Sequence, residues 1–293
     1  MIEVPRARIS VIIPHYNNLD GLARCIDRLR RQTLQRDRFE IVVADNNSAG
    51  GVAAVQRIAP DVRIVRAPEQ GAGPARNAGA SAARGDLFAF IDSDCLAQEK
   101  WLEEGLASLQ QFDYIGGRVV TTVPDNRTVT PAEAYELVFS FDCKRYIEKK
   151  KFAVTANLFV PRAIFKKVGG FRNGVSEDCD WCWRANAMGY RIGYAEKAIV
   201  FHGARREWAE LARKWDRIVA ETFALTKEQP GWRWRWPVRT LSTFLSPLSH
   251  ALRVILSRKL MGVRSKVAGL VGLLGIRIYR TYRMISVMNR AEK

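Results

Sequence analysis

Short apolar runs alternate with helical patterns over the first ninety residues. Four runs are almost wholly apolar and end in polar or turn residues, which predicts buried strands at residues 9–13, 40–44, 62–65 and 87–91. Between them, Leu22, Ile26 and Leu29 recur at helical spacing, and a helix of small residues is predicted from Gly71 to about Arg84. Strands and helices in this alternation predict a mostly parallel, Rossmann-like sheet flanked by helices.

The pattern is less regular further along the chain. It predicts strands at residues 114–120, 154–160 and 191–201 and helices at 131–141 and 177–188, the second ending at Gly189. Apolar side chains then recur at helical spacing over residues 207–227 and 241–256. We expect two domains: an α/β domain at 1–203 and a basic, amphipathic helical region at 204–293.

Composition excludes several classes of protein. The chain has 293 residues, of which 47% are hydrophobic, so it is not intrinsically disordered. Five cysteines, an odd number, do not form a disulfide scaffold, and we expect a reducing cytosol. The apolar run at 9–13 is too short for a secretory leader, and the run at 267–276 is too short for a membrane span. We therefore expect neither segment.

Positive charge is concentrated near the C-terminus. The net charge is +17, of which residues 201–293 contribute +13, and no acidic residue lies between Glu228 and Glu292. Such a segment favours a polyanion, either nucleic acid or an anionic membrane surface. Tryptophan and arginine alternate over 232–236, as at the headgroup layer of a membrane, although both residues also stack on bases. A packed helical subdomain with a solvated basic face is the third possibility. We expect residues 230–293 to contact an anionic membrane and no nucleic acid, because the apolar content exceeds what tracking phosphates requires.

Two pairs of acidic residues are candidates for chemistry. Asp92 and Asp94 follow the fourth predicted strand, where paired carboxylates repel unless a cation such as Mg²⁺ or Mn²⁺ joins them. Glu177 and Asp178 begin a helix, where a carboxylate either caps free N–H groups or serves as a general base.

Three other features have both a structural and a functional interpretation. His202 follows the last predicted strand and either completes a metal site or is structural. Arg76 lies early in the small-residue helix, where it either approaches a phosphate or base or is merely solvated. Cys179 and Cys182 lack a second ligand pair, so we interpret them as packing residues.

The order of these motifs resembles the family 2 glycosyltransferases of GT-A fold over about residues 8–203. The matching segments are Ile9 to Asn17, Val42 to Asn46, Gly71 to Gly79, Asp92-Ser93-Asp94, Gly169-Gly170-Phe171, and Glu177-Asp178 through Ile192. The resemblance implies an inverting transferase that uses a nucleotide sugar, usually a UDP-sugar, and a divalent metal.

The resemblance also implies roles for individual residues. Pro14, Tyr16 and Asn17 would border the base and ribose, Asp45 would hydrogen-bond the uracil, and Arg76 would lie close to it. Asp92 would meet the ribose or sugar, and Asp94 would bind the divalent ion that bridges the diphosphate. His202 would be a further metal or diphosphate ligand. Asp178 would be the catalytic base.

Two segments depart from the family pattern. Asp45-Asn46-Asn47 stands where relatives often have two aspartates, and Trp181-Cys182-Trp183 replaces aliphatic residues near the acceptor side. The second departure predicts an unusual acceptor preference.

Together with the basic helical region at 204–293, the resemblance predicts a peripheral enzyme on the cytoplasmic face of the inner membrane. Its acceptor would be a polyprenyl-diphosphate-linked saccharide used in cell-surface polysaccharide synthesis. Two alternatives stay open: a nucleotidyltransferase that makes sugar nucleotides, and a non-catalytic basic binding protein on the same scaffold.

Overall fold

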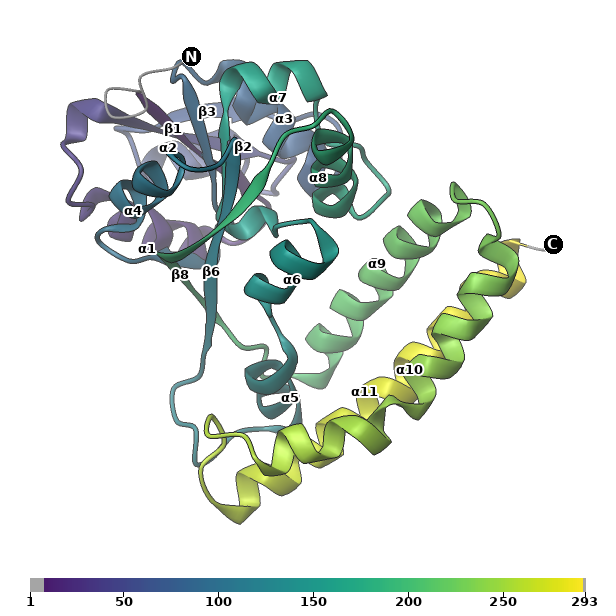
Figure 1. Cartoon of the computed structure of the whole chain (residues 1–293). Coiled ribbons are helices and arrows are strands. Elements are labelled where there is room, and N and C mark those ends of the chain that lie inside the picture. Colours follow the sequence, from purple (N-terminus) through teal and green to yellow (C-terminus); the bar gives the residue numbers. More distant parts are fainter. Residues whose placement is uncertain (1–7, 292–293) are drawn as a thin grey trace. The chain divides into compact units, whose positions relative to one another are not determined.

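The computed structural model describes residues 8–291, which belong to two compact units (Figure 1). The sheet unit comprises Met1–Val120, Phe141–Asn173 and Glu177–His202, and the helical unit comprises Thr121–Ser140, Gly174–Ser176 and Gly203–Lys293. The helical unit thus takes in a segment that we had predicted for the first domain. The physical reason is burial: Tyr135 and Leu137 of that segment share a core with Leu211, Leu273 and Ile276.

Eight strands form one sheet in the order β3-β2-β1-β4-β7-β6-β8-β5. The strands are β1 (Ile9–His15), β2 (Phe39–Asp45), β3 (Arg63–Arg66), β4 (Leu87–Phe90), β5 (Cys95–Ala97), β6 (Tyr114–Thr122), β7 (Leu158–Pro161) and β8 (Ile192–Gly203). The first four in sheet order run parallel, whereas β7 is antiparallel to β4 and β6, and β5 is antiparallel to β8. The predicted α/β fold and its four parallel strands are confirmed.

Strand register brings polar residues to one edge of the sheet. His15 at the end of β1 lies opposite Asp45 at the end of β2, and Ile12 lies opposite Phe90 at the end of β4. The strands themselves are buried on both faces, because Val11 belongs to one core cluster and Ile12 to the other. The chemistry-bearing residues therefore follow the carboxyl ends of the parallel strands, where α/β folds bind ligands.

Seven helices, α1 to α4 and α6 to α8, belong to the described part of the sheet unit. They are α1 (Leu19–Arg30), α2 (Gly51–Ile58), α3 (Ala72–Ala82), α4 (Trp101–Ser108), α6 (Cys143–Lys150), α7 (Arg162–Val168) and α8 (Glu177–Ala187), together with the short 3₁₀ helices η2 (Arg36–Arg38) and η3 (Thr155–Asn157). Asn18 caps α1 by accepting a hydrogen bond from the Gly21 amide at 3.1 Å. Gly189 follows α8 with a φ of +88°, as predicted for its C-terminal end.

The prediction of a strand at residues 154–160 was wrong in its first half. Residues Thr155–Asn157 form η3, and β7 begins only at Leu158. Asn157 is buried, and its amide donates to the carbonyls of Arg118 and Ala198 at 3.0 and 2.9 Å. Its Oδ1 accepts from the Trp101 indole at 2.9 Å. These bonds replace ladder pairing over this segment.

The helical unit consists of α5 (Pro131–Phe139), α9 (Trp208–Lys227), α10 (Trp232–Ile255) and α11 (Gly262–Ala291), and α10 packs along α11 (Figure 1). Helix α10 starts earlier than the predicted 241 and continues through Pro237 and Pro247. The Ser246 hydroxyl donates to the Thr243 carbonyl at 2.7 Å, which is the acceptor that Pro247 leaves without an amide partner. Over residues 8–291, no helix has both the length and the apolar character needed to cross a membrane.

Candidate active site

The end of β4 presents two neighbouring carboxylates. The side chain of Asp92 is 32% exposed and that of Asp94 is 44% exposed, and one oxygen of each lies within 4.8 Å of the other and of the Cys95 Sγ. Strand β5 pairs Cys95 with His202 of β8, which brings the imidazole to the same place. The His202 Nε2 is 3.5 Å from the Asp94 Oδ2.

The donor set at this position fits a divalent cation. Two carboxylates and an imidazole suit Mg²⁺ or Mn²⁺, and the carboxylates are open to solvent on one side. Cys95 is not part of this set, because burial raises the pKa of its thiol well above the ordinary range and a neutral thiol is a poor ligand for a hard ion. Asp92, Asp94 and His202 are therefore the residues that fit a metal.

Arg76 joins the end of β4 to the start of α8. Arg76 is only 3% exposed, and its guanidinium donates to the Asp92 Oδ1 at 2.6 Å and to the Glu177 Oε1 at 2.8 Å. The helix that holds it, α3, begins after Gly71, whose φ of +140° suits glycine and whose amide donates to the Asn46 Oδ1 at 2.8 Å. The Asp92–Asp94 and Glu177–Asp178 motifs thus meet at one arginine. The sequence predicted Arg76 near a base or phosphate and gave no sign of this bridge.

Asp178 has an unusual electrostatic environment. Its Oδ1 accepts a hydrogen bond from the Cys179 amide at 2.7 Å, and its side chain is partly buried. Burial, followed by the charge of Glu177, raises the pKa of Asp178 to about 7, while the Cys179 amide and Arg76 act in the opposite direction. A carboxyl group with this pKa changes protonation state near neutral pH, which suits a general base.

Asp45 is buried rather than open to a ligand. It is 1% exposed, and its Oδ1 lies 3.1 Å from the His15 Nδ1. Because the His15 Nε2 accepts from the Asn18 amide at 3.3 Å, we assign the ring proton to Nδ1, from which it is donated to Asp45. His15 thus holds Asp45 in place, a role that its position at a polar strand end signalled but that sequence analysis did not assign.

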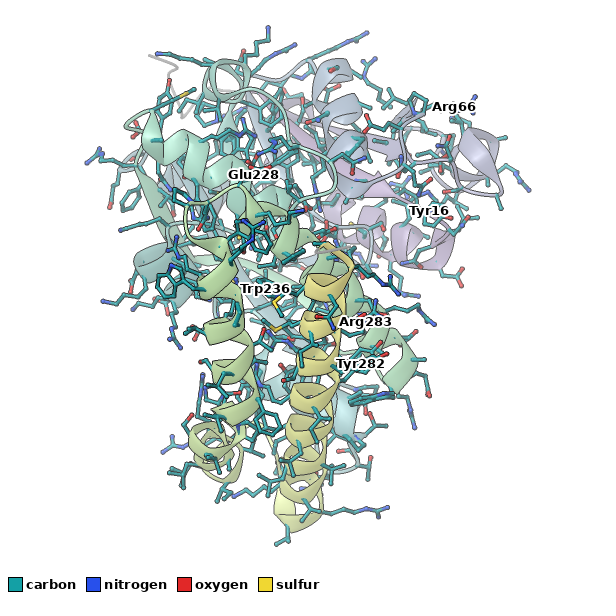
Figure 2. All side chains as sticks on the ribbon, turned by 90° about the vertical axis from the view of Figure 1, so that its right-hand side faces the viewer. Tyr16, Arg66, Glu228, Trp236, Tyr282 and Arg283 are labelled. Carbon is teal, nitrogen blue, oxygen red and sulfur yellow. The ribbon has the colours of Figure 1, made fainter. Side chains whose placement is uncertain are left out.

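The other predicted base-side residues lie at the end of β1 and directly after it. Tyr16, which Figure 2 labels, is an exposed side chain at 54%, and Pro14 is half-buried. Asn17 is exposed with a positive φ of +48°, and its amide donates to the Ser48 Oγ at 3.0 Å. Tyr16 and Asn17 are open to a ligand in this structure, whereas Asp45 is not.

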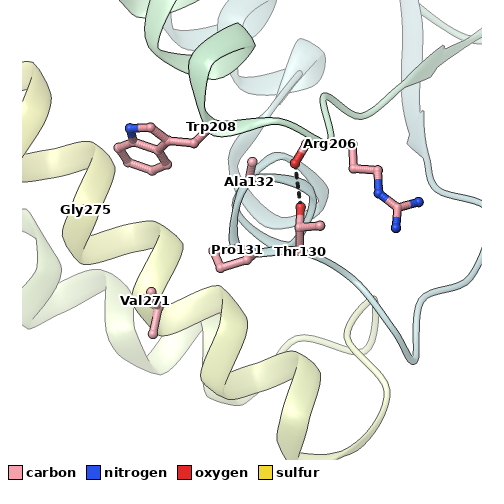
Figure 3. Close-up of a pocket in the computed structure, with 7 residues that line it drawn as sticks. All are labelled: Thr130, Pro131, Ala132, Arg206, Trp208, Val271 and Gly275. Atoms are coloured by element: carbon pink, nitrogen blue, oxygen red, sulfur yellow. Dashed lines mark hydrogen bonds between the residues drawn. The ribbon is translucent and has the colours of Figure 1, made fainter.

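A separate pocket of about 290 Å³ lies in the helical unit (Figure 3). Its lining residues are Thr130, Pro131, Ala132, Arg206, Trp208, Val271 and Gly275. The Thr130 hydroxyl is engaged by the Arg206 carbonyl at 2.9 Å, and the Arg206 guanidinium points away from Trp208 (Figure 3). Because the lining offers little polar chemistry, the pocket is not a candidate for catalysis.

Known proteins share both the sequence and the fold. The family described as glycosyl transferase family 2 matches residues 10–169. The chain is 32% identical over 219 residues to the glycosyltransferase AglE of Haloferax volcanii, covering 72% of this chain and 71% of that protein. It is 30% identical over 223 residues to the pre-mycofactocin glycosyltransferase of Mycobacterium tuberculosis, covering 70% of this chain but only 45% of that protein.

A solved structure resembles the whole described fold. It is the mannosyltransferase PcManGT of Pyrobaculum calidifontis in complex with GDP-Man and Mn²⁺, with a TM-score of 0.64 over 98% of this chain and 88% of that chain. At 18% identity this likeness shows a common fold. The sequence matches favour glycosyl transfer over both alternatives left open above. The chain belongs to glycosyl transferase family 2 and is a glycosyltransferase with the GT-A fold.

Proposed function

We propose that this enzyme transfers a sugar from a nucleotide sugar, with a divalent metal, to a hydroxyl of a membrane-held acceptor, and inverts the anomeric carbon. The bridge from Arg76 to Asp92 and Glu177 is the observation that carries the proposal. It supports a single site that holds the donor's diphosphate at the end of β4 and a base at the start of α8.

The residues of this site divide the chemistry between them. Asp178 accepts the proton of the acceptor hydroxyl, and one base suffices for a direct displacement. Arg76 fixes the position of Glu177 beside that base. A divalent ion bound by Asp92, Asp94 and His202 would neutralise charge on the leaving diphosphate.

The base assignment is tested with Asp178→Asn. Asparagine keeps the size of the side chain but cannot accept the proton, so turnover should fall by about 10²- to 10⁴-fold while nucleotide binding persists. Unchanged turnover would remove Asp178 as the base.

For the donor we propose a UDP-sugar, since that is the usual donor of the family. The solved mannosyltransferase holds GDP-Man, so a guanosine donor is the competing choice. Thermal stabilisation by UDP-, GDP- and dTDP-sugars, each with and without Mn²⁺, distinguishes them, because a ligand at 100 times its Kd stabilises the folded state by about 2.7 kcal/mol. The largest Mn²⁺-dependent shift is expected with a UDP-sugar, and a larger shift with GDP-Man would overturn this choice.

The last two helices of the helical unit, α10 and α11, support a membrane-bound acceptor. Helices α10 and α11 each expose a stripe of large apolar side chains spaced three or four residues apart. On α10 these are Trp234, Val238, Leu241, Leu245, Leu248 and Leu252, and on α11 they are Val263, Val267, Val271, Leu274, Ile278 and Tyr282, the last visible in Figure 2. Leu248 is 81% and Val263 is 79% exposed, which is unfavourable in water over so long a face.

Charge favours an anionic membrane as the partner of this face. No acidic residue lies between Glu228 and Glu292, and each basic residue near an anionic leaflet contributes about 1 kcal/mol. We therefore propose that residues 230–293 lie at the cytoplasmic surface of the inner membrane. The acceptor would be a polyprenyl-diphosphate-linked saccharide of cell-surface polysaccharide synthesis.

A further inference from the structure

Among the described residues of the helical unit, two arginines with largely enclosed guanidinium groups lack a carboxylate partner. Arg277 and Arg280 both lie on α11; Arg277 is only 9% exposed, and Arg280 is partly exposed. Their Nε atoms are buried without a hydrogen-bond partner, and within residues 8–291 neither guanidinium forms an ion pair with a carboxylate. Burying a charge without a counter-charge is unfavourable. A negatively charged partner would therefore stabilise these two side chains.

Two carboxylates on the adjoining helices are already engaged by other cations. Glu136 of α5 accepts from Arg205 at 3.2 Å and from Lys214 at 2.5 Å. Asp216 of α9 pairs with Arg283 at 2.6 Å. Neither of these two carboxylates is therefore a partner for Arg277 or Arg280.

Aromatic rings hold both guanidinium groups in place. The Arg280 Cζ lies 3.6 Å from the centre of the Trp215 ring, and the Arg277 Cζ lies 5.9 Å from that of Phe139. Stacking compensates the faces of a guanidinium but does not supply acceptors for its edge N–H groups. Trp215 adds a third buried donor, its Nε1, which has no hydrogen-bond partner within the described part of the chain.

The cluster is electropositive as a whole. Arg277 also contacts the His250 Nδ1 at 3.3 Å. Burial and the charges of Arg277 and Arg239 lower the pKa of Arg280 to about 10, while Tyr135 acts in the opposite direction. At neutral pH Arg280 is still charged, so the cluster attracts an anion.

We propose that Arg277, Arg280 and Trp215 bind a phosphate or diphosphate group. Such a group offers several acceptor oxygens to the planar, charged forks of two arginines, and Arg280 is accessible to it from solvent. The site lies wholly on the helical unit, apart from the residues assigned to the donor. That the group belongs to the lipid anchor of the acceptor rests on the proposed function, whereas the anion site itself does not.

The test measures binding to the full chain without donor and with EDTA, so that neither metal nor catalysis contributes. The probes are inorganic pyrophosphate, farnesyl diphosphate and farnesol. The binding of each is measured by calorimetry and by the shift in melting temperature. Both anions should bind, farnesyl diphosphate more tightly, and farnesol should not. Arg277→Met and Arg280→Met should each weaken binding by at least about tenfold. Arg264→Met, at an exposed position of the same helix, is the matched control and should bind like wild type.

A second readout separates a ligand site from a structural role. Because each methionine variant removes a largely enclosed cation that has no counter-charge among the described residues, its melting temperature without ligand should equal or exceed that of wild type. Lower melting temperatures combined with wild-type anion binding would overturn the site. Equal binding of pyrophosphate and farnesyl diphosphate would overturn the lipid assignment alone. The Asp94→Ala variant should bind pyrophosphate and farnesyl diphosphate like wild type. An error in the proposed donor site would therefore leave this test of the anion site unaffected.

Discussion

Replacing Glu177 by glutamine should shift the pH dependence of catalysis. The charge of Glu177 is the second cause, after burial, of the high pKa of Asp178. Glutamine keeps an oxygen that can accept from Arg76 but removes the charge. The base should then lose its proton at lower pH, so the variant is expected to retain more of its plateau activity in mild acid.

The size of the shift follows from the order of these causes. The pKa of Asp178 rises from 3.8 to about 7, and burial supplies the larger share. We therefore assign the charge of Glu177 about one pH unit. At pH 6 the base would be ~10% ionised in the wild type and ~50% ionised in the variant, so activity relative to plateau should rise about fivefold.

The assay is kcat/KM against pH with saturating Mn²⁺ and a fixed donor. Wild-type activity should fall as the pH drops through about 7, because a protonated carboxyl group cannot accept the acceptor's proton. Asp180→Asn is a useful control: Asp180 lies on the same helix, but its carboxylate is paired with Arg172 and Arg184 rather than with Arg76. An acidic limb that stays in place in Glu177→Gln would refute the proposed electrostatic coupling.

Three further outcomes are expected. Asp94→Ala should weaken Mn²⁺-dependent nucleotide binding, measured by calorimetry, and a titration like that of wild type would exclude Asp94 as a ligand. The double variant Leu248→Asp with Leu252→Asp should release the protein from anionic liposomes in a sedimentation assay. Its melting temperature should not fall, because both side chains are exposed. The control Ser242→Asp with Ser249→Asp adds the same charge beside the stripe and should release less protein from the liposomes. Asn157→Ala should lower the free energy of unfolding by about 3 kcal/mol in urea, because it leaves buried partners unpaired; a change below about 1 kcal/mol would contradict that.

Buried apolar runs made the parallel part of the sheet predictable. Strands such as β1 are covered on both faces, so Val11 and Ile12 are both apolar and the run stands out from its polar ends. The carboxylates of Asp92 and Asp94 were predictable for the same reason, because they follow such a run directly. Local patterns therefore located the edge of the sheet at which the candidate site lies.

Contacts between distant segments were not predictable. The bridge at Arg76 joins residues 16 and 101 positions away, and no local pattern encodes that meeting. The burial of Asp45 depends on His15, 30 positions earlier. The course of α10 through Pro247 depends on a hydroxyl of Ser246 that takes over a freed carbonyl, whereas proline alone predicts a break.

We propose above that the carboxylates after β4 and the base at the start of α8 serve one donor. Anomalous diffraction from crystals grown with Mn²⁺ and a non-hydrolysable UDP-sugar tests it most directly. We expect manganese coordinated by Asp94 and by the diphosphate, with the Asp178 carboxylate on the face of the sugar opposite the leaving group. Manganese bound elsewhere, or Asp178 on the same face as the diphosphate, would contradict it.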